Sequence, residues 1–170
     1  INDEPVITKE IELAIAEKGF ENNWIVPRPA IISTGYKIAV IGSGPSGLAA
    51  GQELVRKGHQ VTIYEKSNYI GGLLASGIPN YKLDKGILKR RINQLEREGI
   101  QFKRNTTVGK DLPTDEILKN YDAVCLCGGS SIPRNLDVKG RALEGIHFAL
   151  DYLEQGSTID AKNKNVVIIG

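Results

Sequence analysis

The sequence predicts an α/β fold in which a parallel sheet is flanked by helices. Two short apolar runs carry this prediction, KIAVI at residues 37–41 and QVTIYE at residues 60–65. Between them, residues 48–57 have helical spacing, so the three segments have the size of a strand–helix–strand unit. The first run is largely apolar, as expected for a strand that is covered on both faces of a parallel sheet.

The composition is that of a globular chain. Of its 170 residues, 41% are hydrophobic and 25% are charged, and the formal net charge is +2. Such a small net charge argues against nucleic acid as a partner. No apolar run approaches the length of a bilayer span, so no membrane segment is predicted. The start, INDEPVITKE, lacks the features of a signal peptide, and a cytoplasmic location is expected.

A helix and a connector precede the first strand. Apolar spacing predicts a helix over residues 8–18, with Thr8 as its N-cap and Gly19 just after its last turn. Two prolines and no clear period make residues 22–35 an extended connector. Its Trp24 is expected to pack against the protein and to anchor the connector.

Helices and strands alternate beyond residue 65. Asp84 is expected to cap a helix that Gly99 ends. The basic run at residues 89–91 of this helix is expected to be a solvated face. The predicted core face of the helix consists of Ile87, Leu88, the stem of Arg91, Ile92 and Leu95. Further helices are predicted over residues 114–120 and within 147–155, and strands over 100–105, 122–127 (buried) and 165–169.

Three glycines follow the first strand directly in the segment VIGSGPSG, at Gly42, Gly44 and Gly47. A G-x-G-x-x-G spacing between a strand and a helix is typical of Rossmann dinucleotide-binding units. Gly42 would allow the tight turn, Gly44 the close approach of a pyrophosphate, and Gly47 the close packing of helix on strand. The helix N-terminus then offers free N–H groups and a positive dipole end to the phosphates.

An acidic residue, Glu65, ends the second predicted strand. In Rossmann units a carboxylate at this place accepts hydrogen bonds from the ribose hydroxyls of the adenosine half. It would repel a 2′-phosphate, so this site is not predicted to hold a phosphorylated ribose. Gly71 and Gly72 would let a second backbone segment approach the same ligand. The sequence thus predicts a Rossmann-like domain with one dinucleotide site.

The two cysteines, Cys125 and Cys127, are separated by one residue. Side chains two apart on a strand point to the same face. A metal site needs more ligands than this pair offers, so none is predicted. Both are expected to be buried, reduced thiols that behave as small hydrophobes.

Longer stretches of the chain resemble a known family. IAVIGSGPSGLAAGQELVRKGHQVTIYEKSNYIGGLL resembles the FAD fingerprint of the two-dinucleotide-binding flavoproteins. GIPNYKLDKGILKRRINQLEREGIQF and YDAVCLCGGSSIPRNLDVKGRALEGIHFALDYL resemble the small, NADPH-oxidising subunit or domain of glutamate synthase. The resemblance runs from about Asp3 onward. It departs at Cys127-Gly128-Gly129, where the family often has Ala-Thr-Gly, and at Ala75-Ser76, where many relatives have larger residues.

The resemblance implies a flavin relay. Electrons would pass from NADPH to FAD and on to 4Fe-4S clusters, in support of glutamate synthesis from glutamine and 2-oxoglutarate. NADPH and the clusters would bind outside this segment, and no side chain here would be catalytic, because the cofactor carries the chemistry. The implied partner is the glutamate synthase large subunit or an equivalent fused domain.

The resemblance also implies a set of FAD contacts, carried over by position. Two of these contacts have an alternative: Lys82 could be a solvated lysine that touches no cofactor, and Val108 could be a plain core residue. The implied contacts are Gly42, Ser43, Gly44, Pro45, Ser46 and Gly47 at the pyrophosphate, Glu65 and Lys66 at the ribose, Gly71, Gly72 and Leu73 toward the flavin, Lys82 near the cofactor, Val108 at the adenine, and Gly128 and Gly129 closing over it.

The implied domain organisation has three parts. Residues 1–34 would be the helix and connector that leave an upstream iron–sulfur domain. Residues 35–164 would be the first segment of an FAD-binding domain, and residues 165–170 the first strand of an NADPH-binding domain. The FAD domain would therefore be incomplete, and we expect this chain to bind FAD weakly or not at all and not to oxidise NADPH by itself.

Two other interpretations stay open. The electron acceptor could differ, as in ferredoxin–NADP transhydrogenases or dihydropyrimidine dehydrogenase. Alternatively, the unit could be a non-catalytic nucleotide-binding module that serves as a sensor or scaffold. A partner subunit or a fused domain would decide between acceptors, and flavin content would separate the enzyme from the module.

Overall fold

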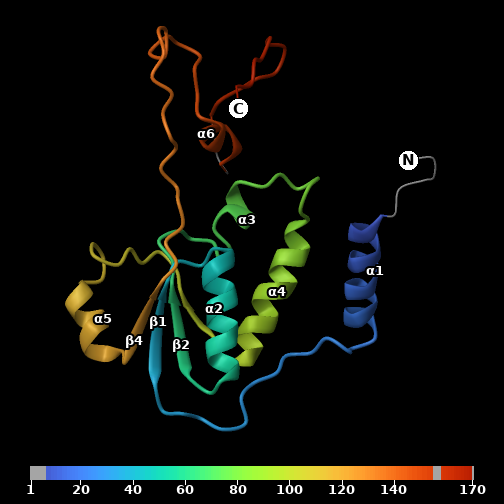
Figure 1. Ribbon diagram of the computed structural model, residues 1–170, viewed down its shortest axis with the longest axis vertical. Coiled ribbons are helices and arrows are strands. Elements are labelled where there is room, and N and C mark those ends of the chain that lie inside the picture. The colour runs from blue at the N-terminus through green and yellow to red at the C-terminus, as the bar shows by residue number, and fades with distance from the viewer. Residues whose placement is uncertain (1–6, 155–157, 170) are drawn as a thin grey trace.

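Four parallel strands form one sheet in the order β3-β2-β1-β4 (Figure 1). The structure is a computed structural model that describes residues 7–154 and 158–169. The strands are β1 (Lys37–Ile41), β2 (Gln60–Tyr64), β3 (Gln101–Lys103) and β4 (Ala123–Leu126). An order of 3-2-1-4 is that of one side and the centre of a Rossmann sheet. The predicted α/β class with a parallel sheet is confirmed.

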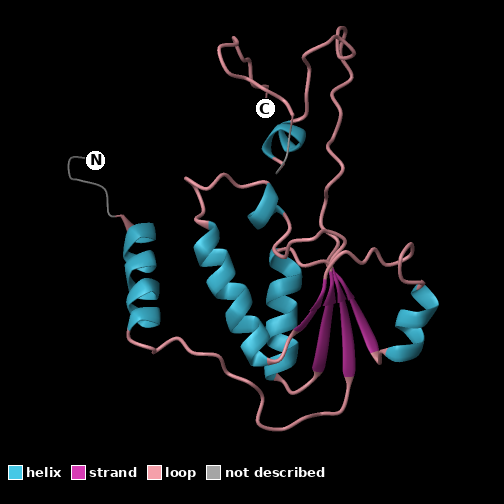
Figure 2. Ribbon diagram, turned by 180° about the vertical axis from the view of Figure 1, so that it is seen from behind, coloured by secondary structure: helices cyan, strands magenta, loops and turns pink. Residues whose placement is uncertain are grey.

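Two helices, α2 (Pro45–Arg56) and α4 (Lys85–Glu98), cover one face of this sheet (Figure 2). Helix α2 begins three residues earlier than predicted, because Pro45 occupies its first turn, where a missing N–H costs nothing. The core lies between α2, α4 and the sheet. It contains Val40, Leu48, Val55, Val61, Ile63, Ile70, Ala75, Leu88, Leu95 and Ile100.

The second face of the sheet is less covered than predicted. Side chains alternate along a strand, so Ile41, Tyr64 and their neighbour Leu126 share the face away from the core. Helix α5 (Thr114–Asn120), with the predicted bounds, lies beside β4. Leu126 nevertheless remains 82% exposed. The expectation of a buried fourth strand is wrong, because β4 is an edge strand of the described sheet with one open face.

Helix α4 has the predicted ends but a more polar buried face. The Asp84 carboxylate accepts a hydrogen bond from the Gly86 N–H at 2.7 Å, and Gly99 ends the helix in the left-handed conformation. Leu88 and Leu95 are buried as expected, whereas Ile87 is 36% exposed. Instead of Ile87, two polar residues are buried, Gln94 and Glu98, because α2 presents polar side chains to this face of α4.

The basic run of α4 is largely engaged, contrary to the solvated face expected. Only Lys89 is exposed. Arg90 makes a two-pronged ion pair with Glu17, at 2.7 and 2.6 Å, and lies 3.9 Å from the centre of the Phe20 ring. Arg91 donates to Gln52 of α2 and to Gln94 of its own helix. Tertiary partners therefore override the local pattern.

Helix α1 (Thr8–Glu21) extends beyond its predicted end. Ile7 takes the N-cap position, because its carbonyl already accepts the helical hydrogen bond from Ile11, so Thr8 lies inside the helix. Gly19 does not follow the helix but lies in it, and its buried position admits the side chain of Ile25.

The connector after α1 is anchored by its main chain and by Ile25. The N–H groups of Trp24 and Ile25 donate to the Gly19 carbonyl at 2.8 and 3.0 Å. This turn directs Ile25 toward the helix, whereas the Trp24 side chain is 67% exposed. The predicted role of Trp24 as the anchor is therefore wrong.

The last part of the described chain departs most from the prediction. A long loop leaves β4 and leads to the short helix α6 (Ala149–Leu153), inside the predicted 147–155, of which residue 155 lies outside the described residues (Figure 1). Residues 165–169 form no strand in the structure, and Val167 is 85% exposed. A strand forms through a ladder with a neighbour, and the described sheet pairs only β1 to β4.

None of the described helices combines the length and the apolar character that crossing a membrane would require.

Candidate dinucleotide-binding site

The glycine loop lies at the carboxyl edge of the sheet, where three strands end side by side. Ile41, the last residue of β1, is paired with Tyr64 of β2 and with Leu126 of β4. In the sheet, β1 lies between β2, to which the chain continues through α2, and β4, which comes later in the sequence. In open α/β sheets, ligands bind at such a switch point, outside the carboxyl ends of the strands.

Two of the loop glycines occupy positions where a side chain has no room. Gly42 has φ +105°, and a Cβ on it would lie 2.3 Å from the carbonyl oxygen of Cys127. A Cβ on Gly47 would lie 1.9 Å from the carbonyl oxygen of Gly42. These contacts bring the start of α2 against the loop and hold the loop against the end of β4.

The third loop glycine faces open space. A Cβ on Gly44 would meet nothing within 4 Å, and Gly44 is the N-cap of α2. The first-turn amides of a helix have no intrahelical acceptor, and Pro45 has no N–H. Ser46 and Gly47 therefore supply the N–H donors here, together with the positive end of the helix dipole. An open N-terminus without a Cβ fits a pyrophosphate.

Ser43 joins three segments of the site through its hydrogen bonds. It is fully buried; its N–H and its hydroxyl both donate to Oε2 of Glu65, at 3.0 and 2.5 Å. The Ser43 Oγ also accepts a hydrogen bond from the Gly71 N–H at 3.1 Å. The resemblance had placed Ser43 against the pyrophosphate, but its side chain points to Glu65. Spacing alone does not reveal this orientation.

Glu65 directly follows β2, which ends one residue earlier than predicted, and its carboxylate is turned inward. The residue is 6% exposed, and its Oε1 accepts from the Ser67 N–H at 2.9 Å. Burial raises the pKa of Glu65, but the hydrogen bonds from Ser43 and Ser67 outweigh burial and hold the pKa below its ordinary value. The backbone and side-chain donors of Ser43 and Ser67 thus keep the carboxylate charged and fixed in place.

The second glycine pair packs directly on the first loop. A Cβ on Gly72 would lie 3.0 Å from the Cα of Gly44. The following helix α3 (Leu73–Ser76) is held by Lys85, whose ammonium group donates to the carbonyls of Leu74 at 2.8 Å and Ile78 at 2.5 Å. Lys85 supports this segment and was not identified from the sequence, since a lysine in a first helical turn carries no recognisable signal.

The other predicted contacts lie in more open places. Val108 is half-buried and forms an isolated bridge with Leu112. Exposed positions are Pro45, Ser46, Lys66, Leu73, Lys82, Gly128 and Gly129. The structure thus gathers residues 42–47, Glu65 and Gly71–Gly72 into one packed unit. The ligand contacts of all these residues stay predictions.

The cysteine pair borders the same loop. Both thiols are free and half-buried rather than buried, with their sulfur atoms 3.6 Å apart. They share one face, as predicted, and Ser46 Oγ donates to the sulfur of Cys127 at 3.5 Å. In the described part of the chain, no group of three or more His, Cys, Asp or Glu residues is arranged to hold a metal ion.

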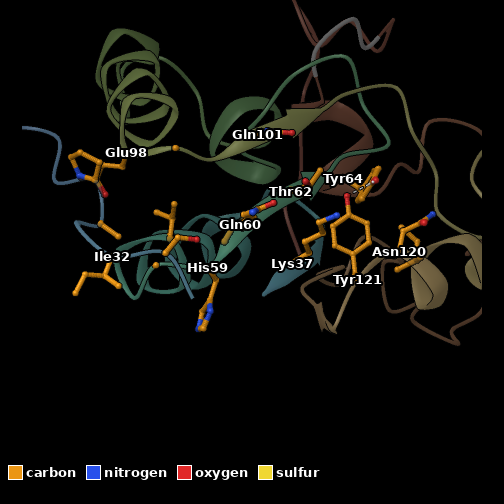
Figure 3. Close-up of a pocket in the computed structure, with 18 of the residues that line it drawn as sticks. Ile32, Lys37, His59, Gln60, Thr62, Tyr64, Glu98, Gln101, Asn120 and Tyr121 are labelled. Carbon is orange, nitrogen blue, oxygen red and sulfur yellow. Dashed lines mark hydrogen bonds between the residues drawn. The ribbon is translucent and has the colours of Figure 1, made fainter. Parts of the chain in front are cut away.

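A separate hollow lies away from the glycine loop. It measures about 660 Å³ and is lined by the first residues of three strands, Lys37, Gln60 and Gln101, and by Tyr64 and Tyr121 (Figure 3). The two phenols are hydrogen-bonded at 2.9 Å. Burial, followed by the bond to Tyr121, raises the pKa of Tyr64 to about 12. This hollow runs from the amino ends of the strands, beside Val55 and Glu98, to the face that carries Tyr64.

The parallel sheet, the glycine loop at a helix N-terminus and the acid after β2 define a Rossmann-type nucleotide-binding domain. The profile of the pyridine nucleotide-disulphide oxidoreductase family matches residues 36–170. The chain belongs to this family.

Among curated proteins, the chain is similar to glutamate synthases. It is 46% identical over 182 residues to the glutamate synthase [NADPH] small chain of Bacillus subtilis, covering all of this chain and 37% of that protein. It is 47% identical over 184 residues to the glutamate synthase [NADH] of Schizosaccharomyces pombe, covering all of this chain and 9% of that protein. The chain thus spans 37% and 9% of the lengths of these two relatives.

Among solved structures, the chain is similar to Mycobacterium tuberculosis FprA in complex with NADPH. The TM-score is 0.64 at 29% identity, over 70% of this chain and 28% of FprA. A 2-naphthoyl-CoA reductase bound to 2-naphthoyl-CoA is also similar, with a TM-score of 0.58 at 29% identity, over 79% of this chain and 20% of the reductase. Both resemblances agree with the fold and the family.

Proposed function

We propose that this chain is the first part of the FAD-binding domain of a glutamate synthase small chain or of an equivalent fused domain. The whole protein would pass electrons from NADPH through FAD to iron–sulfur clusters for the synthesis of glutamate from glutamine and 2-oxoglutarate. The observation that carries the proposal is the open Gly44 at the N-terminus of α2, held between two positions that admit only glycine. The sequence identity to proteins that are named glutamate synthases supports glutamate synthesis as the reaction that uses these electrons.

In this proposal the chain's own groups bind and orient the cofactor. The N–H groups of Ser46 and Gly47 donate to the pyrophosphate, and the missing Cβ of Gly44 allows its close approach. Glu65 accepts a hydrogen bond from a ribose hydroxyl, the role of the acid that follows the second strand of a Rossmann unit. FAD, when bound, supplies the step between two-electron and one-electron transfer.

The remaining contacts of the proposal follow the family pattern. Lys66 lies at the ribose, Leu73 toward the flavin, Lys82 and Val108 beside the cofactor, and Gly128 and Gly129 over it. The proposed partner is a glutamate synthase large subunit or domain, which the small-chain names of the relatives support. The two free thiols suit a reducing compartment, which supports the cytoplasm.

The proposed domain boundaries follow from the family resemblance described above. Residues 1–34 would leave an iron–sulfur domain, residues 35–164 belong to the FAD domain, and residues 165–170 begin an NADPH-binding domain. The family match from residue 36 onward supports the first boundary.

FAD binding tests the proposal with FMN as the matched ligand. We expect weak but measurable quenching of FAD fluorescence when the chain binds FAD. FAD should bind at least about tenfold more tightly than FMN. FMN lacks the adenosine half and the pyrophosphate, and these are the parts that interact with charged or dipolar groups of the site. ADP should compete with FAD. Equal affinities for FAD and FMN, or no FAD binding at near-millimolar concentrations, would contradict the proposal.

Gly44→Ala is the variant that separates binding from folding. Its Cβ enters open space in the protein, so we expect unfolding to become easier by no more than about 1 kcal/mol, the cost of a poorer N-cap. The same Cβ occupies the place of the pyrophosphate, and FAD affinity should fall by about tenfold or more, in line with the cost of overpacking. Unchanged FAD affinity in Gly44→Ala would place the ligand elsewhere.

The chain is expected not to oxidise NADPH by itself. Its 170 residues contain one G-x-G-x-x-G motif, and the proposal assigns that motif to FAD. The measurement is NADPH-dependent dye reduction in the presence of added FAD, with the rate of free FAD as the control. NADPH-dependent turnover above that control would show that the segment carries a second, functional nucleotide site.

A further inference from the structure

The sulfur atoms of Cys125 and Cys127 form a close pair at the carboxyl end of β4. They lie 3.6 Å apart on the core-facing side of the strand. Both residues are half-buried, so a small oxidant can reach them. The spacing along the strand places their Cα atoms about 6.6 Å apart, which is at the upper end of the range that a disulfide spans.

Cys127 is also part of the wall of the glycine loop. Its N–H donates to the Ile41 carbonyl at 2.8 Å and holds β4 to the end of β1. Its carbonyl oxygen lies where a side chain of Gly42 would be, and its sulfur accepts a hydrogen bond from Ser46 in the first turn of α2. A displacement of Cys127 therefore reaches both sides of the proposed phosphate site.

We propose that Cys125 and Cys127 are a redox-sensitive dithiol, which peroxide converts reversibly to an intramolecular disulfide that loosens the glycine loop. Its effect on cofactor binding rests on the function proposed above, whereas the oxidation and the loosening do not.

The chemistry of this step is balanced by one molecule of hydrogen peroxide. One cysteine thiolate attacks an oxygen of the peroxide, the O–O bond breaks, and the first water leaves as the sulfenic acid forms. The second thiol attacks the sulfenic sulfur, the S–S bond forms, and the hydroxyl group leaves as a second water. Two thiols are oxidised by two electrons and the peroxide is reduced by two.

The roles of the two sulfur atoms follow from their surroundings. Burial, and then the contact with Cys127, raises the pKa of the Cys125 thiol. Cys125 is therefore the slower nucleophile, and Cys127, at the open end of the strand, is the sulfur that reacts first.

Closing the disulfide distorts β4. The sulfur atoms move from 3.6 Å to about 2.05 Å, and an extended strand has to shorten between the two residues. The hydrogen bond from Cys127 to Ile41 is the contact most directly affected. A strained disulfide of this kind is readily reduced, which makes the oxidation reversible.

Intact mass spectrometry tests the dithiol. The chain is treated with hydrogen peroxide, quenched with catalase and alkylated under denaturing conditions. We expect a monomer that takes up no alkyl group, is lighter by two hydrogen atoms, and regains two alkylatable thiols with dithiothreitol. Cys125→Ser and Cys127→Ser are matched controls that cannot lose these hydrogens. Two thiols that stay free, or that only gain oxygen atoms, would overturn the proposal.

Hydrogen exchange tests the coupling to the loop without any ligand. Peroxide-treated chain should exchange the amides of residues 42–48 roughly two- to tenfold faster than reduced chain, the effect of losing one net hydrogen bond. Peroxide-treated Cys125→Ser should exchange them at the reduced rate. Equal exchange in the oxidised and reduced chain would overturn the coupling.

FAD titration of the same samples separates this proposal from the proposed function. Oxidation is expected to weaken FAD binding to the chain but not to Cys125→Ser. If reduced chain does not bind FAD, the proposed function fails, while the mass and exchange results still decide whether the dithiol forms and acts on the loop.

Discussion

Replacing Gly47 with alanine is expected to lower the free energy of unfolding by about 3 kcal/mol, at the upper end of the cost of overpacking. The added Cβ would lie 1.9 Å from the carbonyl oxygen of Gly42. A backbone atom cannot rotate away as a flexible side chain can, so either α2 or the loop must shift. The melting temperature should fall by roughly 6–12 °C, as measured by circular dichroism.

Gly51→Ala, in the same helix, is the matched control for Gly47→Ala. A Cβ on Gly51 would meet the terminal methyl groups of Ile63 at 2.8 Å and Ile100 at 3.2 Å. These methyl groups can move, and alanine favours a helix over glycine by about 1 kcal/mol. We expect Gly51→Ala to be clearly milder. If Gly47→Ala is as stable as the unaltered chain, the loop and helix are not in the contact described.

Replacing Glu98 with alanine should be about as severe, with a loss of about 2–4 kcal/mol in the free energy of unfolding. The Glu98 side chain is fully buried and accepts from Gln52 at 2.8 Å and from Arg56 at 2.9 and 2.8 Å. Its removal leaves these donors without an acceptor. Arg56 keeps 32% of its side-chain surface exposed. Water can therefore partly hydrate its charge in the variant, and the loss of free energy of unfolding is smaller than for a wholly buried ion pair.

The charge of Glu98 should also make the stability of the folded chain depend on pH. Burial raises the pKa of Glu98, but the hydrogen bonds from Arg56 and Gln52 outweigh it and hold the pKa below the ordinary value of 4.5. A carboxyl with a lowered pKa stabilises the folded state above 4.5, and this contribution is lost as the pH falls through the lower, folded-state pKa. Glu65 contributes in the same direction.

Glu98→Gln isolates the Glu98 contribution to this pH dependence. Glutamine keeps the shape of the side chain but has no charge to lose. Urea unfolding should therefore show the largest difference from the unaltered chain near neutral pH and a smaller difference in the acid range. Arg97→Gln, on the same helix but in an exposed position, controls for a change of surface charge. A difference that stays constant or grows in acid would contradict the assignment.

The parts of the fold that local sequence signals determine were predictable. A glycine spacing, an acid at a strand end, the Asp84 cap and the Gly99 stop each act within a few residues. For this reason β1 and both ends of α4 were placed correctly, and β2 was placed to within one residue. Helix α5 was predicted with its observed bounds for the same reason.

What could not be predicted depends on partners far away in the sequence. Arg90 meets Glu17 across 73 positions, and the turn after α1 brings Ile25, not Trp24, onto Gly19. In the candidate site, the position of Glu65 at the predicted strand end indicated it as a ligand contact, and the family resemblance implied Ser43. Their mutual hydrogen bonds depend on rotamers that packing selects, which no motif encodes.

The hydrogen bonds of Ser43 have a consequence for the order in which the site assembles during folding. They join residues that are only 22 and 28 positions apart in the sequence. The hydrogen bond from the Lys37 N–H to Asp122, beside the β1–β4 pairing, joins residues that are 85 positions apart. Shorter loops close at a lower entropic cost and contribute to faster folding. The unit of residues 42–47, Glu65 and Gly71–Gly72 is therefore expected to form early, and the end of β4 that carries the cysteines is expected to join it late.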